Sequence, residues 1–165
     1  MDVTTNNTKS KVNIRLLVGT GMLSGLAFVL QYLEFPIPIM PFFIRFDFSD
    51  LPALIGAFAY GPLAGVIVEF IKNLLHCTVT QSFTVGELSN FILGAVFTGT
   101  AGLIYKKNKT KKGAIIGAIV GSVIMGIISF PSNLFIVYPA YEKFTPINEI
   151  MDAYSKLLPL SLIHI

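Results

Sequence analysis

Five polar side chains lie within or beside long apolar runs of this chain, where polar groups are costly and are candidates for function. Glu69 and Lys72 are three residues apart, as are Glu87 and Asn90, so each pair falls on one face of a helix. Asn133 lies in the last apolar run. These groups can hydrogen-bond a polar substrate. The structural alternatives are an ion pair for Glu69 and Lys72, a helix-dipole contact for Glu87 and an interhelical hydrogen bond for Asn133.

The residue types do not favour a catalytic site or a metal site. The acids are too scattered to form a carboxylate cluster, and His76 and Cys77 adjoin without a third ligand. A single cysteine excludes an internal disulfide. The chain has no Gly-rich phosphate loop followed by Lys and Ser or Thr, which ATP hydrolysis would need. We therefore expect a binding protein with no catalytic residues, no metal and no cofactor.

An acidic hairpin is the first element that positions these side chains. Asp47 and Asp50 precede an apolar run, Gly61-Pro62 breaks it, and a second apolar run carries Glu69 and Lys72. Proline suits the first turn of a helix. We expect the two aspartates at the mouth of the hairpin, with Asp50 the better candidate to cap its first helix.

The composition predicts an all-α integral membrane protein. The 165 residues are 53% hydrophobic and 13% charged, against about a quarter charged in soluble domains. A membrane helix needs about 20 apolar residues. We predict one transmembrane domain, residues 1–165, with short second and third spans. The five spans are residues 14–33, 48–60, 61–75, 85–105 and 113–137.

A proline-rich loop joins the first two spans. Pro36, Pro38 and Pro41 prevent a regular helix there, yet the loop is almost wholly apolar. Irregular backbone at a membrane must pack onto protein, because lipid cannot hydrogen-bond its amides. Residues 34–47 are therefore predicted to form an extracellular lid.

Charge asymmetry predicts the orientation. Eight of the twelve basic residues flank the first span or lie between the fourth and fifth, against one acid, Asp2. The positive-inside rule makes this side, with the polar N-terminus at residues 1–13, cytoplasmic. The eight are Lys9, Lys11, Arg15, Lys106, Lys107, Lys109, Lys111 and Lys112. A nucleic-acid patch is the weaker alternative for the lysine-rich loop.

The C-terminal tail does not complete a sixth span. Residues 160–165 are what the bases CTG TCT CTT ATA CAC ATC encode, which match a transposon adapter used to prepare sequencing libraries. We expect this tail to be non-native and the natural protein to continue with a sixth helix. A natural short apolar tail is the alternative.

Several motifs together resemble the riboflavin-specific substrate-binding subunits (S components) of energy-coupling factor (ECF) vitamin transporters. The resemblance covers nearly the whole chain and is strongest over residues 44–76, which include Asp47-Phe48-Ser49-Asp50-Leu51-Pro52-Ala53-Leu54-Ile55-Gly56, Gly61-Pro62-Leu63-Ala64-Gly65-Val66 and Glu69-Phe70-Ile71-Lys72-Asn73-Leu74-Leu75-His76. Further matches are Gly86-Glu87-Leu88-Ser89-Asn90-Phe91, Leu103-Ile104-Tyr105-Lys106 and Lys112-Gly113-Ala114-Ile115-Ile116-Gly117.

The resemblance implies a bundle of six transmembrane helices, of which about five are present here. It implies riboflavin capture near the outer surface, a transmembrane scaffold subunit and two ATP-binding subunits as partners. It also implies that small residues on the first helix face the scaffold. Gly21, Ser24 and Gly25 fit this role, and packing within the bundle is the alternative. The chain departs from the family by lacking the sixth helix, which carries an Asn and a Lys near the substrate.

Riboflavin requires an aromatic slot for its flat ring and a few polar groups for its dione edge and ribityl hydroxyls. Asn133 matches a substrate-contacting position in the family pattern. The proposed binding residues are Asn133, Glu87, Asn90, Lys72, Phe42, Phe43 and Phe46. Two alternatives stay open: an S component for another vitamin, such as thiamine or pantothenate, and a small intramembrane enzyme acting on lipid head groups.

Overall fold

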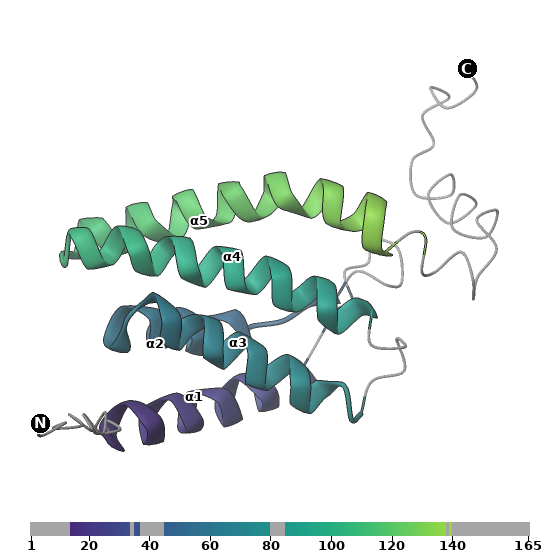
Figure 1. The fold of residues 1–165 in the computed structure, drawn as a ribbon, viewed down its shortest axis with the longest axis horizontal. Coiled ribbons are helices and arrows are strands. Elements are labelled where there is room, and N and C mark those ends of the chain that lie inside the picture. The colour runs from purple at the N-terminus through teal and green to yellow at the C-terminus, as the bar shows by residue number, and fades with distance from the viewer. Residues whose placement is uncertain (1–13, 34, 37–44, 80–84, 138, 140–165) are drawn as a thin grey trace, which may run out of the picture.

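The protein folds as a bundle of helices that run beside one another (Figure 1). The structure is a computed structural model that describes residues 14–33, 35–36, 45–79, 85–137 and 139. Its elements are α1 (Ile14–Tyr32), β1 (Phe35–Pro36), β2 (Arg45–Phe46), α2 (Asp50–Tyr60), α3 (Pro62–His76), α4 (Val85–Lys107), α5 (Lys111–Ser132) and the π-helical turn η1 (Asn133–Val137). The predicted all-α architecture is confirmed, apart from the two short strands.

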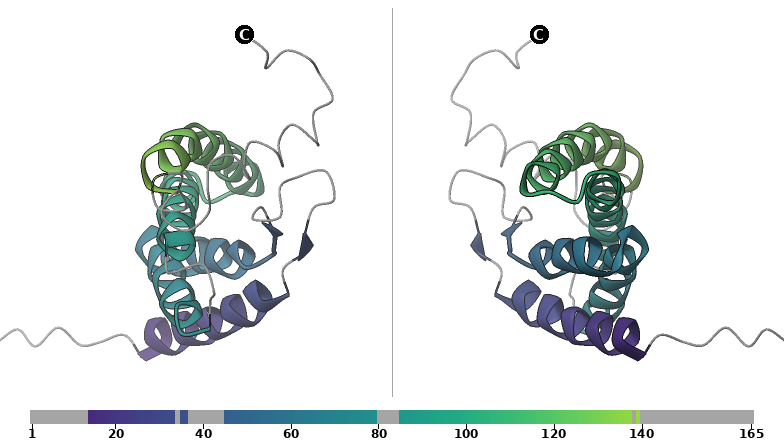
Figure 2. Two further views of the ribbon diagram at one scale, coloured as in Figure 1. Left: turned by 90° about the vertical axis from the view of Figure 1, so that its right-hand side faces the viewer. Right: turned by 90° about the vertical axis from the view of Figure 1, so that its left-hand side faces the viewer.

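Helices α3 and α4 form the middle of the bundle. Helix α3 contacts α1, α2 and α4, and α4 also contacts α5. Seen end-on, α1 and α5 lie on opposite sides (Figure 2). One end of the bundle holds the start of α1, the α2–α3 turn and the α4–α5 turn. We call it the basic end because it carries Arg15, Lys106, Lys107, Lys109, Lys111 and Lys112.

Burial follows the pattern of a membrane protein rather than a soluble one. Small side chains such as Ala27, Ala53 and Ala101 are fully buried, whereas Met22 and Phe130 are about three-quarters exposed, at 73% and 74%. Small residues let membrane helices approach closely, and large apolar residues then face lipid. Three helical segments in the described part of the chain are long and apolar enough to cross a membrane, Ile14–Tyr32, Gly86–Lys107 and Lys111–Ile136.

The turn between α2 and α3 forms as predicted. Gly61 adopts a φ of 105°, a left-handed conformation that side chains with a Cβ rarely tolerate, and its N–H bonds the Ala57 carbonyl. Pro62 follows at the first position of α3, where a missing N–H costs nothing. These two residues therefore reverse the chain with no intervening loop.

The turn between α4 and α5 is closed by a threonine cap. Thr110 has extended backbone, and its hydroxyl accepts a hydrogen bond from the Gly113 N–H at 3.0 Å. Three buried glycines on α5, Gly113, Gly117 and Gly121, then let the helix approach its neighbours closely. A Cβ on Gly117 would lie 2.8 Å from the Ala101 carbonyl oxygen of α4.

The start of α2 differs from the prediction. The helix begins at Asp50 rather than near Phe48, and its N-cap residue is Ser49. Asp50 is the first helical residue, so the prediction that it caps the helix is wrong. Its carboxylate pairs instead with a lysine of α3.

Candidate functional site

A buried lysine joins α3 to the start of α2. Lys72 is fully buried, and its ammonium donates hydrogen bonds to Ser49 Oγ at 2.8 Å and to Asp50 Oδ1 at 2.5 Å. Its Nζ also lies 2.9 Å from Glu69 Oε2, one turn earlier on α3. We call Ser49, Asp50, Glu69 and Lys72 the lysine cluster. The predicted pairing of Glu69 with Lys72 is confirmed, and three oxygen contacts surround the ammonium.

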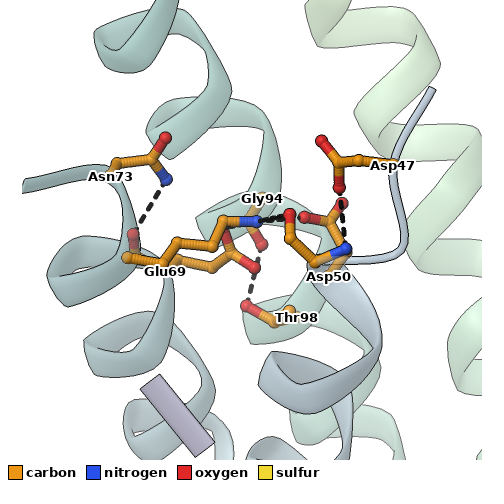
Figure 3. Close-up of polar contacts among 8 residues, drawn as sticks. Asp47, Asp50, Glu69, Asn73, Gly94 and Thr98 are labelled. Atoms are coloured by element: carbon orange, nitrogen blue, oxygen red, sulfur yellow. Dashed lines mark hydrogen bonds and ion pairs between the residues drawn. The ribbon is translucent and has the colours of Figure 1, made fainter. Parts of the chain in front are cut away.

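Helix α4 closes the lysine cluster from the other side. Glu69 is fully buried, and a Cβ on Gly94 would collide with its carboxylate. Thr98 lies one turn further along α4, and its hydroxyl donates a hydrogen bond to the Gly94 carbonyl at 2.8 Å. Figure 3 shows Glu69 and Asn73 on one helix facing Gly94 and Thr98 on the next. The absent side chain at Gly94 thus provides the space for a buried carboxylate.

Three side-chain oxygens near the cluster have no hydrogen-bond partner among the described residues. They are Glu69 Oε1, Glu69 Oε2 and Asn73 Oδ1, and of these Glu69 Oε2 is within ion-pair distance of Lys72 Nζ. The Asn73 amide instead donates to the Glu69 carbonyl at 2.8 Å. Both residues lie on the same face of α3, four positions apart, so the unsatisfied oxygens belong to one polar stripe in the bundle.

A second polar group lies at the end opposite the basic end. His76 Nδ1, near the end of α3, is 3.0 Å from Glu87 Oε1 in the first turn of α4. A carboxylate only accepts, so the imidazole N–H donates in this contact. The His76 ring also meets Tyr32 of α1 edge-on, with centroids 6.2 Å apart. These contacts join α1, α3 and α4, and Glu87 is buried among them.

The next residue, Cys77, follows α3 directly and is partly buried. Burial raises the pKa of its thiol, and the Glu87 carboxylate raises it further. A thiol with a raised pKa is a weak nucleophile at neutral pH. We therefore assign Cys77 no chemistry, in keeping with the sequence.

Two serines join α4 to the end of α5. Ser89 Oγ and Ser132 Oγ are 2.9 Å apart, and both residues are buried. Pro131 lies inside α5 just before this point, and the helix widens into the π turn η1 immediately after it. A proline removes a helical hydrogen bond, and π turns are frequent at functional sites.

The π turn begins at Asn133, the principal candidate from the sequence. Its amide lies 3.3 Å from Ser129 Oγ, and the residue is half-buried. Asn90, on α4, is half-buried as well. Asn133, Asn90 and Glu87 all lie at the end opposite the basic end, so the structure brings three of the predicted binding residues to one region.

The other predicted binding residues fall elsewhere. Phe42 and Phe43 lie outside the described residues. Phe46 ends strand β2, which pairs with Phe35 in β1. Lys72 is one turn before the end of α3 and is fully buried between Asp50 and Glu69. Ser49, Gly94 and Ser132 were not predicted from the sequence, because each contacts a residue of a distant helix and no local spacing indicates such a contact.

The small residues of α1 separate into two faces. Ser24 is buried, and its hydroxyl donates to the Thr20 carbonyl at 2.8 Å. Gly21 and Gly25 are exposed, and a Cβ on either would meet nothing within 4 Å. The two glycines therefore leave an open, shallow strip on the outer face of α1.

Comparison with known proteins decides the family. The model for the substrate-specific component of ECF transporters matches residues 15–164. The chain belongs to this family. The resemblance found in the sequence motifs is thus confirmed, and this S component is a multi-pass membrane protein.

Two relatives and one solved structure are similar to this S component over most of their length. The riboflavin transporter RibU of Staphylococcus aureus (strain TCH60) is 36% identical over 165 residues, covering 95% of this chain and 87% of its own length. The riboflavin transporter FmnP of Bacillus subtilis (strain 168) is 36% identical over 161 residues, covering 92% and 85%. A solved structure of the S component of a bacterial ECF transporter aligns with a TM-score of 0.73 at 41% identity, covering 78% of this chain and 76% of that chain.

Proposed function

We propose that this S component captures riboflavin from the outside of the cell and hands it to partner subunits for ATP-driven uptake. The observation that carries the proposal is the match to two curated riboflavin transporters, each 36% identical over more than nine-tenths of the chain. The family match, over residues 15–164, spans α3, α4 and α5, the helices that carry Lys72, Glu87, Asn90 and Ser132.

The polar end of the bundle offers the groups that riboflavin needs. The amides of Asn90 and Asn133 both donate and accept, which suits a dione edge with its ring N–H. Glu87 can accept from ribityl hydroxyls at the start of α4. For the flat ring we propose Phe42, Phe43 and Phe46 as the aromatic wall. Riboflavin is thus the one small molecule that this chain is proposed to bind.

The charge distribution supports an outward-facing vitamin site. Five lysines of the basic end lie within the seven residues 106–112, around the α4–α5 turn, and all five are exposed. Basic residues concentrate on the cytoplasmic side of membrane proteins. We infer that the basic end and the N-terminus lie inside, in the plasma membrane of a prokaryote. Asn90 and Asn133 then lie at the outer end.

We propose that other chains supply the energy for uptake. We propose that a transmembrane scaffold subunit docks on the outer face of α1, where Gly21 and Gly25 allow a second helix to approach closely. Ser24 supports that face from within by its bond to the α1 backbone. Two ATP-binding subunits, attached to the scaffold, would supply hydrolysis.

Titration of the purified, detergent-solubilised chain with three vitamins tests the proposed substrate. Riboflavin fluorescence should be quenched on binding, at one vitamin per chain, because a flavin enclosed by aromatic side chains loses its emission. Thiamine and pantothenate in excess should not displace it. Displacement by either vitamin, or no quenching by a folded chain, would refute riboflavin as the substrate.

A further inference from the structure

Helix α2 is short, and it begins beside α3 with Ser49 fully buried. Its 11 residues extend about 16 Å, roughly half the hydrocarbon thickness of a bilayer. Asp50, its first residue, contacts Lys72, which lies a full turn before the end of α3. The connection from β2 into α2 therefore lies beside α3, about one turn before that helix ends.

The serine at this connection does not cap its own helix. Ser49 occupies the N-cap position and is fully buried, yet its side chain makes no capping hydrogen bond. Its hydroxyl accepts from Lys72 instead. An N-cap bond normally stabilises a helix, so diverting it is a local cost. Departures from local rules of this kind are expected where function sets the geometry.

Stability alone does not explain a buried lysine here. Well-packed apolar side chains of similar volume often stabilise a protein as much as a buried ion pair or more. The ion pairs add geometric specificity, because an ammonium that contacts three oxygens fixes the positions of the residues that carry those oxygens. Lys72 has contacts with Ser49, Asp50 and Glu69, so it holds the start of α2 at one register along α3.

The position of the start of α2 also determines where the two strands lie. Asp47 Oδ1 accepts a hydrogen bond from the Ser49 N–H at 2.7 Å, so the segment just before α2 is held by the residue that Lys72 holds. Strand β2 ends at the preceding residue, Phe46, and pairs with β1, which closely follows α1. Hydrogen bonds thus lead from Lys72 to Ser49 and from Ser49 to Asp47, and Asp47 is the next residue in the chain after strand β2. Figure 3 shows Asp47 and Asp50 close together at the start of α2.

We propose that Lys72 is a positioning residue for riboflavin binding, which holds the β1–β2 ribbon in register with α3 through Ser49 and Asp50 and does not touch the vitamin. The inference rests on the proposed function, because riboflavin retention is its readout. It replaces the direct contact suggested by the sequence with an indirect role. It also makes Ser49 and Asp50 members of the same functional unit.

Dissociation of riboflavin from detergent-solubilised full-length variants tests this role. Ser49→Ala removes one contact of Lys72 and leaves both carboxylates in place, so it should fold and release riboflavin about three to ten times faster. Asp50→Asn should act in the same direction. Each single change should increase the dissociation rate by some factor. The double variant should show an increase smaller than the product of those two factors, because both changes act through Lys72.

Lys72 itself is tested without leaving a fully buried charge. The pair Glu69→Gln with Lys72→Met removes both fully buried charges, and it should release riboflavin faster while the absorption spectrum of bound flavin stays unchanged. Lys106→Met, an exposed lysine at the basic end, is the matched control and should behave as the unaltered chain. Retained secondary structure, measured by circular dichroism, establishes that the variants are folded.

The outcomes separate the alternatives. A changed spectrum of bound flavin in the Lys72 variant, with Ser49→Ala and Asp50→Asn unaffected, would mean direct contact and overturn the proposal. Unchanged dissociation in all folded variants, with only the melting temperature lowered, would mean a purely structural cluster and also overturn it. If the unaltered chain fails to bind riboflavin, the proposed function fails instead.

Discussion

Glu69 and Gly94 show how one missing side chain permits a buried charge. The Glu69 carboxylate lies against Gly94 of α4, and a Cβ there would collide with it. Breaking a buried ion pair is costly, because the remaining charges keep their desolvation penalty. The residue at position 94 therefore controls the lysine cluster from a different helix.

Gly94→Ala should lower the free energy of unfolding by about 1–3 kcal/mol, since the added methyl forces the carboxylate or α4 to move. Gly99→Ala is the matched control on the same helix. A Cβ at Gly99 would lie 3.6 Å from Val66 Cγ2, an ordinary contact, so this variant should be neutral or slightly stabilising. Thermal unfolding in detergent compares the two. Equal stability of both variants would show that Glu69 can relax freely.

The sequence predicted part of this cluster. The three-residue spacing of Glu69 and Lys72 predicted their pairing, because that spacing is a property of any helix. It could not predict Ser49 and Asp50 as partners, since they are more than twenty positions from Lys72 and join it only when α2 packs on α3. Asp50 was therefore misassigned as a cap, the role that local propensity favours.

The seam between α4 and α5 is an element-scale feature built from glycine. Gly117 and Gly121 of α5 contact the backbone of α4, where a Cβ would lie within 2.9 Å of a carbonyl oxygen. Close approach of this kind provides the dispersion contacts that hold membrane helices together in lipid. It also orients the end of α5, where Ser132 meets Ser89 and the π turn begins.

Gly117→Val should separate the two helices and weaken riboflavin binding by about tenfold or more, because Asn133 lies at the far end of the displaced helix. Gly126→Val is the control, since Gly126 lies on the same helix with nothing within 4 Å of its Cβ position. Fluorescence titration measures both. A loss of affinity in the control alone would contradict the assigned seam.

Helix bounds were predictable because hydropathy and turn residues act locally. The Gly61-Pro62 break and the five helical runs follow from apolar length and from two residues with special backbone needs. The strands β1 and β2 were not predicted, because two residues each leave no periodic pattern. The π turn was missed as well, since Pro131 predicts a kink without predicting its form.

At the scale of the whole molecule, the two ends of the bundle differ in charge, and this difference predicts the orientation in the membrane. The single cysteine of the chain, Cys77, lies at the end opposite the basic end and can report it. Lys109, in the exposed α4–α5 turn, offers a position on the other side.

A membrane-impermeant maleimide should label Cys77 in intact cells. Labelling should be faster at about pH 8.5 than at about pH 7, because the thiol pKa is raised and the reactive thiolate forms only as the pH rises toward it. In a Cys77→Ser background, Lys109→Cys should react only after permeabilisation. The reverse labelling pattern would mean that the chain has the opposite orientation, with the proposed vitamin site on the cytoplasmic side.

Binding of tritiated riboflavin to sealed, right-side-out vesicles that contain this chain and no partner subunit tests the central claim most directly. We predict saturable binding of one riboflavin per chain at the outer face, without accumulation inside the vesicle, and no competition from thiamine or pantothenate. Absence of saturable riboflavin binding, with the chain folded and correctly oriented, would contradict the account.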